Sequence, residues 1–243
     1  MPTTRLDIEY DGSRFRGWAA QPGQRTVQGD LEAALTTILR EQVGLSVAGR
    51  TDAGVHAWGQ VASFESRSPA GGNLARSLNG VLSADVAVTA AGPVPDAFDA
   101  RRDARSRTYC YRVLTRAAPS PFEEGRSLWW PRAIERQALD VCAAALAGSH
   151  DFTAFTPTDS DHVRFERQIL RAEWLSEGDV LCFWVEADAF MRNMVRVLVG
   201  TMLEVASGDR TAENFTALLE GAARERGGET APAHGLYLAS VRY

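Results

Sequence analysis

Lysine is absent from this chain of 243 residues, so all 26 of its basic residues are arginines. They are outnumbered by 31 acidic residues, and the formal net charge of −5 argues against a nucleic-acid partner, which normally meets a basic face. A local stripe can differ from the sum, however. Residues 101–116 contain only one acid beside six arginines, at positions 101, 102, 105, 107, 112 and 116. Arginine stacks on bases and forks onto phosphates better than lysine does, so this stripe fits either a solvated surface or an RNA contact.

Cysteine and long apolar runs are also scarce. The three cysteines lie far apart, without the spacing of a disulfide framework, and they and the four histidines lack the spacing of metal ligands. We therefore expect neither a disulfide nor a metal. No apolar run is long enough to span a bilayer, and the first residues lack the apolar core of a signal peptide. The sequence thus predicts a cytoplasmic protein without a membrane partner.

The most informative stretch is residues 48–57, Ala-Gly-Arg-Thr-Asp-Ala-Gly-Val-His-Ala, which joins two apolar runs. Two glycines bracket Arg50, Thr51 and Asp52, and glycine lets a chain bend sharply and approach a ligand closely. The pattern predicts a tight loop that presents one carboxylate and one guanidinium. An aspartate in such a loop is usually a turn residue. Arg50 is nevertheless close enough to keep the Asp52 carboxylate ionised if the two side chains converge.

Hydrophobic periodicity predicts two consecutive units with one element order. The first has strands over 6–10, 45–48, 58–64 and 86–91, a helix over 27–39 that Thr26 caps, and a short helix over 74–82. The second has strands over 109–113, 163–176, 179–187 and 236–241, with helices from about 132, from about 190 and around 215. This β-α-β-β-α-β order predicts an α+β protein with two tandem ferredoxin-like modules, residues 1–106 and 107–243. Each module would have an antiparallel sheet with helices on one face.

The string from Gly49 to His56 resembles the active-site motif of the tRNA pseudouridine synthase A (TruA) family. The resemblance covers essentially the whole chain, because six further motifs match in the family's order; they lie at residues 10–28, 98–101, 107–111, 151–155, 194–196 and 231–238. It implies an isomerase that converts uridine to pseudouridine at positions 38–40 of the tRNA anticodon stem-loop. It also implies a homodimer that uses base flipping and needs neither metal nor cofactor. In each subunit the antiparallel sheets of the two modules would flank a central basic cleft.

The resemblance also implies roles for single residues. Asp52 corresponds to the essential aspartate, Tyr109 to the tyrosine that packs on the target uracil, Arg50 to the arginine of base flipping, and Arg196 to the arginine that pairs with the aspartate. Tyr109 also fits a core position of its strand, and Arg196 a surface arginine. The tRNA-contacting segment corresponds to residues 98–102, with Phe98, Arg101 and Arg102, and a second one to residues 159–163. Whether the carboxylate attacks C1′ or abstracts a ribose proton stays open.

The chain departs from the family pattern at three places. Asp99 replaces the usual histidine, and residues 159–162 are acidic where an RNA contact favours the opposite charge. Ala70 stands where the family often carries a basic residue, for which Arg67 is the nearest substitute. All three departures concern RNA contacts and leave the Asp52 loop intact.

Three other functions are compatible with parts of the pattern. Paired ferredoxin-like sheets resemble RNA-recognition modules that stack bases without chemistry, but such a module gives the Arg-Thr-Asp loop no purpose. A glycoside hydrolase usually needs two facing carboxylates, and only Asp52 has a motif around it. Metal-dependent hydrolysis lacks ligand spacing. Release of tritium from uridine C5 of tRNA separates an isomerase from all three.

Overall fold

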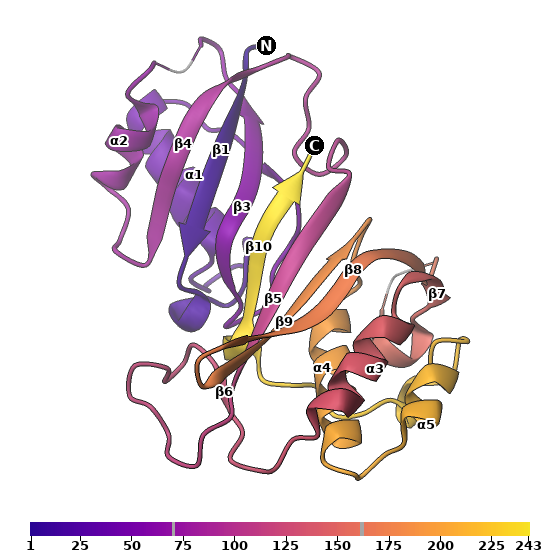
Figure 1. Cartoon of the computed structure of the whole chain (residues 1–243). Helices are drawn as coiled ribbons and strands as arrows, with labels where there is room; N and C mark the ends of the chain where they lie inside the picture. The colour runs from indigo at the N-terminus through magenta and orange to yellow at the C-terminus, as the bar shows by residue number, and fades with distance from the viewer. Residues whose placement is uncertain (70, 161–162) are drawn as a thin grey trace. The chain divides into compact units, whose positions relative to one another are not determined.

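The computed structural model describes residues 1–69, 71–160 and 163–243, which form two compact units. Unit 1 holds Met1–Arg105 together with Tyr237–Tyr243, and unit 2 holds Ser106–Leu236. The fold is mixed α+β, with mostly antiparallel sheets and few helices, as predicted (Figure 1). The division into domains over residues 1–106 and 107–243 stays a prediction. Among the described residues, no helix has the length and apolar character needed to cross a membrane.

Unit 1 is built on strand β1, whose alternating apolar side chains are buried. Its strands are β1 (Thr3–Tyr10), β2 (Ser46–Val47), β3 (His56–Glu65), β4 (Val86–Val94) and β10 (Leu236–Arg242), the last of which enters this unit at Tyr237. β1 pairs antiparallel with β3 and β4, β2 pairs antiparallel with β3, and β10 pairs parallel with β3. Helix α2 (Leu74–Asn79) packs against β4, and α1 (Val27–Leu39) packs against α2. The sheet thus holds the start of β3 between β1 and β10.

Unit 2 has a sheet in the order β5-β9-β8-β7, with all neighbours antiparallel. These strands are β5 (Ser106–Leu114), β7 (Gly148–Asp151), β8 (Glu166–Glu177) and β9 (Val180–Ala187), and β6 (Leu128–Trp129) runs parallel to β5. The helices α3 (Arg136–Ala145), α4 (Met194–Ala206) and α5 (Ala212–Ala217) pack on one another, α3 against β8 and α4 against β5. Figure 1 shows them on one side of this sheet. Short 3-10 helices cover Gly12–Arg14, Thr153–Phe155, Arg224–Arg226 and Ala233–Gly235.

The helices lie where they were predicted, but several of them begin or end at other residues than predicted. Helix α1 has the predicted bounds, and the Thr26 hydroxyl accepts a hydrogen bond from the Gly29 amide at 3.2 Å. Helix α4 begins at Met194 and not near residue 190, because Asn193 has the left-handed φ of 60°. Helix α3 begins at Arg136 and not near residue 132, because Glu135 is extended. Helix α2 ends at Asn79, so the predicted continuation to residue 82 is wrong.

The strands differ from prediction mainly in length. β2 has only two residues, and β8 begins at Glu166 and not at residue 163. β4 continues to Val94, three residues beyond its predicted end at residue 91. β6 and β7 were missed because neither carries an alternating apolar pattern. The strands predicted over 163–176 and 179–187 are confirmed as β8 and β9, which form an antiparallel hairpin with Gly178 at a φ of 63° in the turn.

Candidate active site

The loop from Ala48 to Val55 joins β2 to β3 and carries Asp52. Its chain is closed on itself, because the Val55 amide donates to the Asp52 carbonyl at 3.1 Å and Gly54 has a left-handed φ of 80°. It is also tied to its surroundings, because the Trp18 amide donates to the Thr51 carbonyl at 3.0 Å. The predicted tight loop is thus confirmed. It holds the Asp52 side chain in a partly buried position and leaves Arg50 exposed.

A buried hydrogen-bond network anchors this loop to the sheet. The Tyr10 hydroxyl lies 2.7 Å from Thr51 Oγ1, and Gln60 Nε2 donates to the same hydroxyl at 3.3 Å and to the Gly49 carbonyl at 2.7 Å. The Tyr10 and Thr51 hydroxyls can each donate or accept, so either one can supply the proton of this hydrogen bond. Burial raises the pKa of Tyr10 to about 12, against its hydrogen bonds to Thr51 and Gln60, so the phenol is neutral at physiological pH. The backbone beside Asp52 is therefore fixed by side chains of β1 and β3.

Two glycines let the segment after β1 approach the loop closely. A Cβ at Gly17, whose φ is +94°, would lie 2.9 Å from the Thr51 carbonyl oxygen, and one at Gly12 would lie 2.0 Å from the Val55 carbonyl oxygen. The Gly12 amide donates to Nδ1 of the buried His56 at 3.1 Å, and Oδ1 of Asp11 lies 3.3 Å from the same nitrogen. The sequence motif at residues 10–18 therefore supports the Asp52 loop, a role that its pattern alone did not reveal.

Tyr109 and Arg196 belong to unit 2, whereas Asp52 and Arg50 belong to unit 1. Tyr109 lies on β5 with 7% of its surface exposed, and its ring meets the ring of Phe190 edge-on, with centroids 5.0 Å apart. The burial of Tyr109 is compatible with a core position and with stacking on a base. The meeting of these four side chains at one site stays a prediction.

The Arg196 guanidinium is held by two acceptors within unit 2. Its Nε donates to the Ala231 carbonyl at 2.7 Å, and its Nη1 donates to Asn193 Oδ1 at 2.9 Å. Arg196 lies in the first turn of α4 and is partly buried. Burial raises the pKa of the neighbouring Tyr111, an effect that the positive charge of Arg196 opposes. The side chain is thus a fixed group within its unit and not a loose surface arginine.

The predicted RNA-contacting residues Arg101 and Arg102 are exposed on a turn that Asp99 caps. The Asp99 carboxylate accepts hydrogen bonds from their two amides at 2.9 and 2.8 Å. Burial alone would raise the pKa of Asp99, but these amides and the Ser46 hydroxyl hold that pKa below its ordinary value. Asp99, which replaces the family's histidine, therefore shapes the turn that presents the two arginines. Phe98 packs on the Tyr243 ring, with centroids 4.9 Å apart.

The remaining arginines of the stripe are not a uniform basic face. Arg112 forms an ion pair with Glu123 at 2.8 Å, and the Arg116 guanidinium lies 3.6 Å from the carboxylate of Asp179. The predicted stripe is therefore interrupted by acids from elsewhere in the chain.

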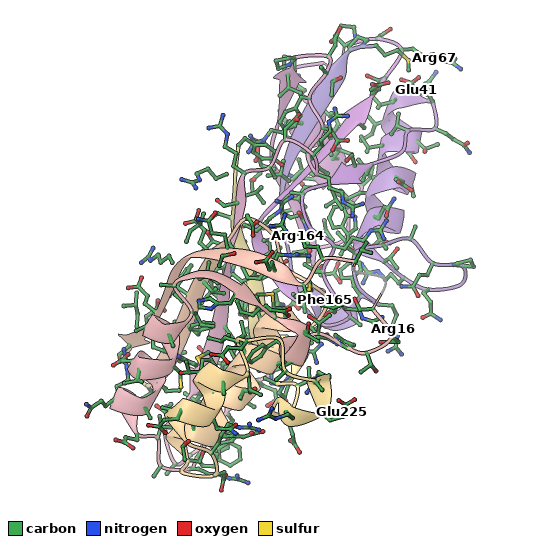
Figure 2. All side chains as sticks on the ribbon, turned by 90° about the vertical axis from the view of Figure 1, so that its right-hand side faces the viewer. Arg16, Glu41, Arg67, Arg164, Phe165 and Glu225 are labelled. Carbon is green, nitrogen blue, oxygen red and sulfur yellow. The ribbon has the colours of Figure 1, made fainter. Side chains whose placement is uncertain are left out.

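Two residues at the places where the sequence departs from the family pattern, Arg67 and Asp159, each lie beside a residue of opposite charge. Arg67 lies beside Glu41, as Figure 2 shows, with its Nε 3.5 Å from the carboxylate. Asp159 forms an ion pair with Arg192, so this part of the acidic segment is locally neutralised. Residues 70, 161 and 162, which belong to the departures, lie outside the described residues.

No group of three or more histidines, cysteines, aspartates or glutamates in the described part of the chain has the arrangement of a metal site. The three cysteines, Cys110, Cys142 and Cys182, are buried free thiols. Burial raises the pKa of Cys142 to about 11. These thiols are therefore core residues.

Comparison with known proteins identifies the family. The family model described as tRNA pseudouridine synthase matches residues 142–243. A tRNA pseudouridine synthase A of Frankia casuarinae is 46% identical over 98% of this chain and 88% of the relative. One of Mesorhizobium japonicum is 41% identical over the full length of both chains. A solved structure of a Cbf5-Nop10-Gar1 complex contains a chain that matches over 82% of this chain and 53% of the other, at 13% identity. Its TM-score of 0.37 is too low to indicate a shared fold. With whole-length identities above 40%, this chain belongs to the tRNA pseudouridine synthase A family, a family of isomerases.

Proposed function

We propose that this chain isomerises uridine to pseudouridine at positions 38–40 of the tRNA anticodon stem-loop, with Asp52 as its catalytic residue. Membership of the family supports the reaction class. The observation that carries the role of Asp52 is the anchoring of its loop. Thr51, directly before it, is held by Trp18 and Tyr10, and Gly49 is held by Gln60. A carboxylate placed on so restrained a loop is held in one geometry, as a catalytic group must be.

The chemistry needs one carboxylate and no redox partner. The N1–C1′ bond of uridine breaks, the base turns, and a C5–C1′ bond forms; the hydrogen on C5 is lost to solvent, and N1 gains one. Nothing is oxidised or reduced, so we propose that neither metal nor cofactor takes part. An ionised Asp52 serves this sequence either as a nucleophile at C1′ or as a base toward a ribose proton.

The other site residues take the roles that a flipped base requires. Extruding a base from a stacked stem costs a few kcal/mol and calls for a substitute stack. Tyr109 would supply the stack and Arg50 the group that occupies the vacated position. Arg196 would keep Asp52 charged and aimed, which its two fixed acceptors favour. Phe98, Arg101 and Arg102 would contact the tRNA, and exposure of the two arginines on a capped turn supports this.

We further propose that the two units are tandem ferredoxin-like modules that flank a basic cleft, and that two copies of the chain bind one tRNA as a homodimer. The element order β1-α1-β2-β3-α2-β4 in unit 1 supports the first module, and β5-α3-β8-β9-α4 in unit 2 follows the same order up to the last strand, since β10 enters unit 1 at Tyr237. The proposed reaction site would then need residues from both units.

Tritium release from tRNA labelled at uridine C5 tests the proposal. The protein should release tritium without added metal, and transcripts with cytidine at positions 38–40 should release none from those positions. Asp52→Asn should abolish release while leaving tRNA binding nearly intact, because the amide keeps the shape of the side chain and loses its charge. Substantial turnover by this variant would remove Asp52 from the mechanism.

A further inference from the structure

Asn193 combines two unusual features at the start of α4. Its backbone is left-handed, with a φ of 60° and a ψ of −3°, and Arg40 is the one other residue besides glycine with positive φ in the described part of the chain. Asparagine tolerates this region better than most residues, but it is not a relaxed conformation. Outliers of this kind persist where the surrounding structure requires them, and they gather at functional sites.

The side chain of Asn193 does not do what an asparagine at a helix start usually does. Such a residue normally has an extended backbone, and its side-chain oxygen accepts a hydrogen bond from an amide in the first turn. Asn193 has a left-handed backbone, and its side chain makes no capping hydrogen bond. Its Oδ1 instead accepts from Arg196 Nη1 at 2.9 Å. The acceptor is therefore directed to the guanidinium and not to the helix.

The second acceptor of the guanidinium is part of a rigid segment. The Ala231 carbonyl accepts from Arg196 Nε at 2.7 Å, and the Ala231 amide donates back to the Arg196 carbonyl at 3.1 Å. This segment lies directly on α4, because a Cβ at Gly200 would be 1.9 Å from the Glu229 carbonyl oxygen. With one acceptor fixed by this packing, the contact to Asn193 fixes the rotation of the guanidinium.

We infer that Asn193 is a positioning residue that aims the Arg196 guanidinium, and that its left-handed backbone is kept because it places Oδ1 beside Nη1. The inference rests on the proposed role of Arg196 toward Asp52. Two of the five N–H donors of an arginine are engaged by Asn193 and Ala231, so these contacts set where the planar fork of the side chain points.

Asn193→Gly separates this role from a structural one. Glycine adopts the left-handed backbone readily, so the variant should unfold at the same temperature as the parent protein or higher. It lacks the acceptor, however, and a hydrogen bond to a charged group is strong enough that kcat should fall roughly tenfold or more. The KM for tRNA should stay unchanged. The acid limb of the kcat/KM profile should move to higher pH, because a misaimed Arg196 no longer favours the ionised Asp52.

Two further variants serve as controls. Asn193→Asp keeps an oxygen acceptor at the same reach and should retain kcat within a few-fold of the parent value. Arg40→Gly relaxes the other left-handed residue, which lies at the end of α1, and should raise stability without changing kcat. A fall in kcat for Arg40→Gly equal to that for Asn193→Gly would overturn the inference, because relaxing a backbone would then suffice.

A double-mutant cycle with Arg196→Gln distinguishes the inference from the proposed function. If Asn193 acts through Arg196, adding Asn193→Gly to Arg196→Gln should lower kcat no further. An Arg196→Gln variant with full activity would refute the proposed role of Arg196 itself. If Arg196→Gln is inactive or slow while Asn193→Gly keeps full kcat, or if the two effects simply multiply, the inference about Asn193 alone is overturned.

Discussion

The hydroxyl of Tyr10 offers the sharpest test of how the Asp52 loop is held. Tyr10→Phe removes one oxygen and keeps the ring, so it leaves the apolar packing of β1 in place. That oxygen lies 2.7 Å from Thr51 Oγ1 and 3.3 Å from Gln60 Nε2. Thr51 and Gln60 are 7% and 0% exposed, so water does not readily replace the lost partner.

The expected loss of stability follows from these two hydrogen bonds. Each intramolecular bond contributes about 1 kcal/mol net, and a buried polar group left without a partner costs about 1 to 3 kcal/mol. Gln60 keeps its bond to the Gly49 carbonyl and the Thr51 hydroxyl can rotate, which limits the penalty. We expect Tyr10→Phe to lower the free energy of unfolding by about 2 kcal/mol. For a chain of this length the unfolding temperature should fall by roughly 4–8 °C.

The effect on catalysis should exceed the effect of lost stability alone. Because Thr51 precedes Asp52, loosening it should misplace the carboxylate, and kcat for tritium release should fall at least about tenfold with the KM for tRNA unchanged. Asn79→Ala is the matched control: it removes the two hydrogen bonds between the Asn79 side chain and the Val88 backbone, at 2.9 and 2.8 Å, without touching the loop. If both variants lose stability and both keep full kcat at a temperature where they are folded, the anchoring role of Tyr10 is wrong.

Three other predictions concern charge and pH. The pKa of Tyr10 is raised to about 12 in the folded protein, so its contribution of about 3 kcal/mol is complete below pH 10 and is lost as pH rises through 12; the free energy from urea unfolding should fall more steeply across this range than in Tyr10→Phe, which keeps only the slope from other groups such as Tyr111. Asp99→Ala should lower the free energy of unfolding by about 1 kcal/mol and raise the KM for tRNA, because the turn of Arg101 and Arg102 loses its cap; Asp99→Asn keeps the acceptor, and an equal loss there would contradict capping. Arg101→Ala and Arg102→Ala should each make the salt dependence of tRNA binding shallower by about one unit of slope, whereas Arg40→Gly, which removes an exposed charge elsewhere, should not; an unchanged slope would argue against phosphate contact.

Local sequence patterns were sufficient to predict those elements whose structure depends on residues close to one another in the chain. Helix α1 has the predicted bounds because Thr26 caps it and its apolar residues recur at helical spacing. The β8–β9 hairpin was predictable because Gly178 supplies the left-handed turn residue between two apolar runs. By contrast, the residues before α4 continue an apolar helical spacing, and only the left-handed backbone at Asn193 excludes them from the helix. No local sequence pattern predicts the left-handed backbone of Asn193, because an asparagine at a helix start usually has an extended backbone.

The support of the Asp52 loop was not predictable for a different reason, since it depends on strand register. Tyr10 and Gln60 are fifty residues apart, and they meet because β1 pairs antiparallel with β3 in a register that places Gln60 opposite Ile8, two residues before Tyr10. Since every second side chain of a strand points to the same face, this register brings Gln60 and Tyr10 together on one face of the sheet. A glutamine in the middle of a mostly apolar strand was the signal that the sequence offered, because a polar group that becomes buried must find partners.

The motif at residues 10–18 and the Asp52 loop thus pack against each other and form one structural unit. The segment with Tyr10, Gly12 and Gly17 has no side chain of its own in the proposed chemistry, yet a Cβ at either glycine would collide with the backbone of the Asp52 loop. The requirement for glycine there is a requirement of shape, because no larger side chain fits against the loop that carries Asp52. A short catalytic motif can therefore specify an active site only together with the distant residues that hold it, as Asn193 and Ala231 hold Arg196 in unit 2.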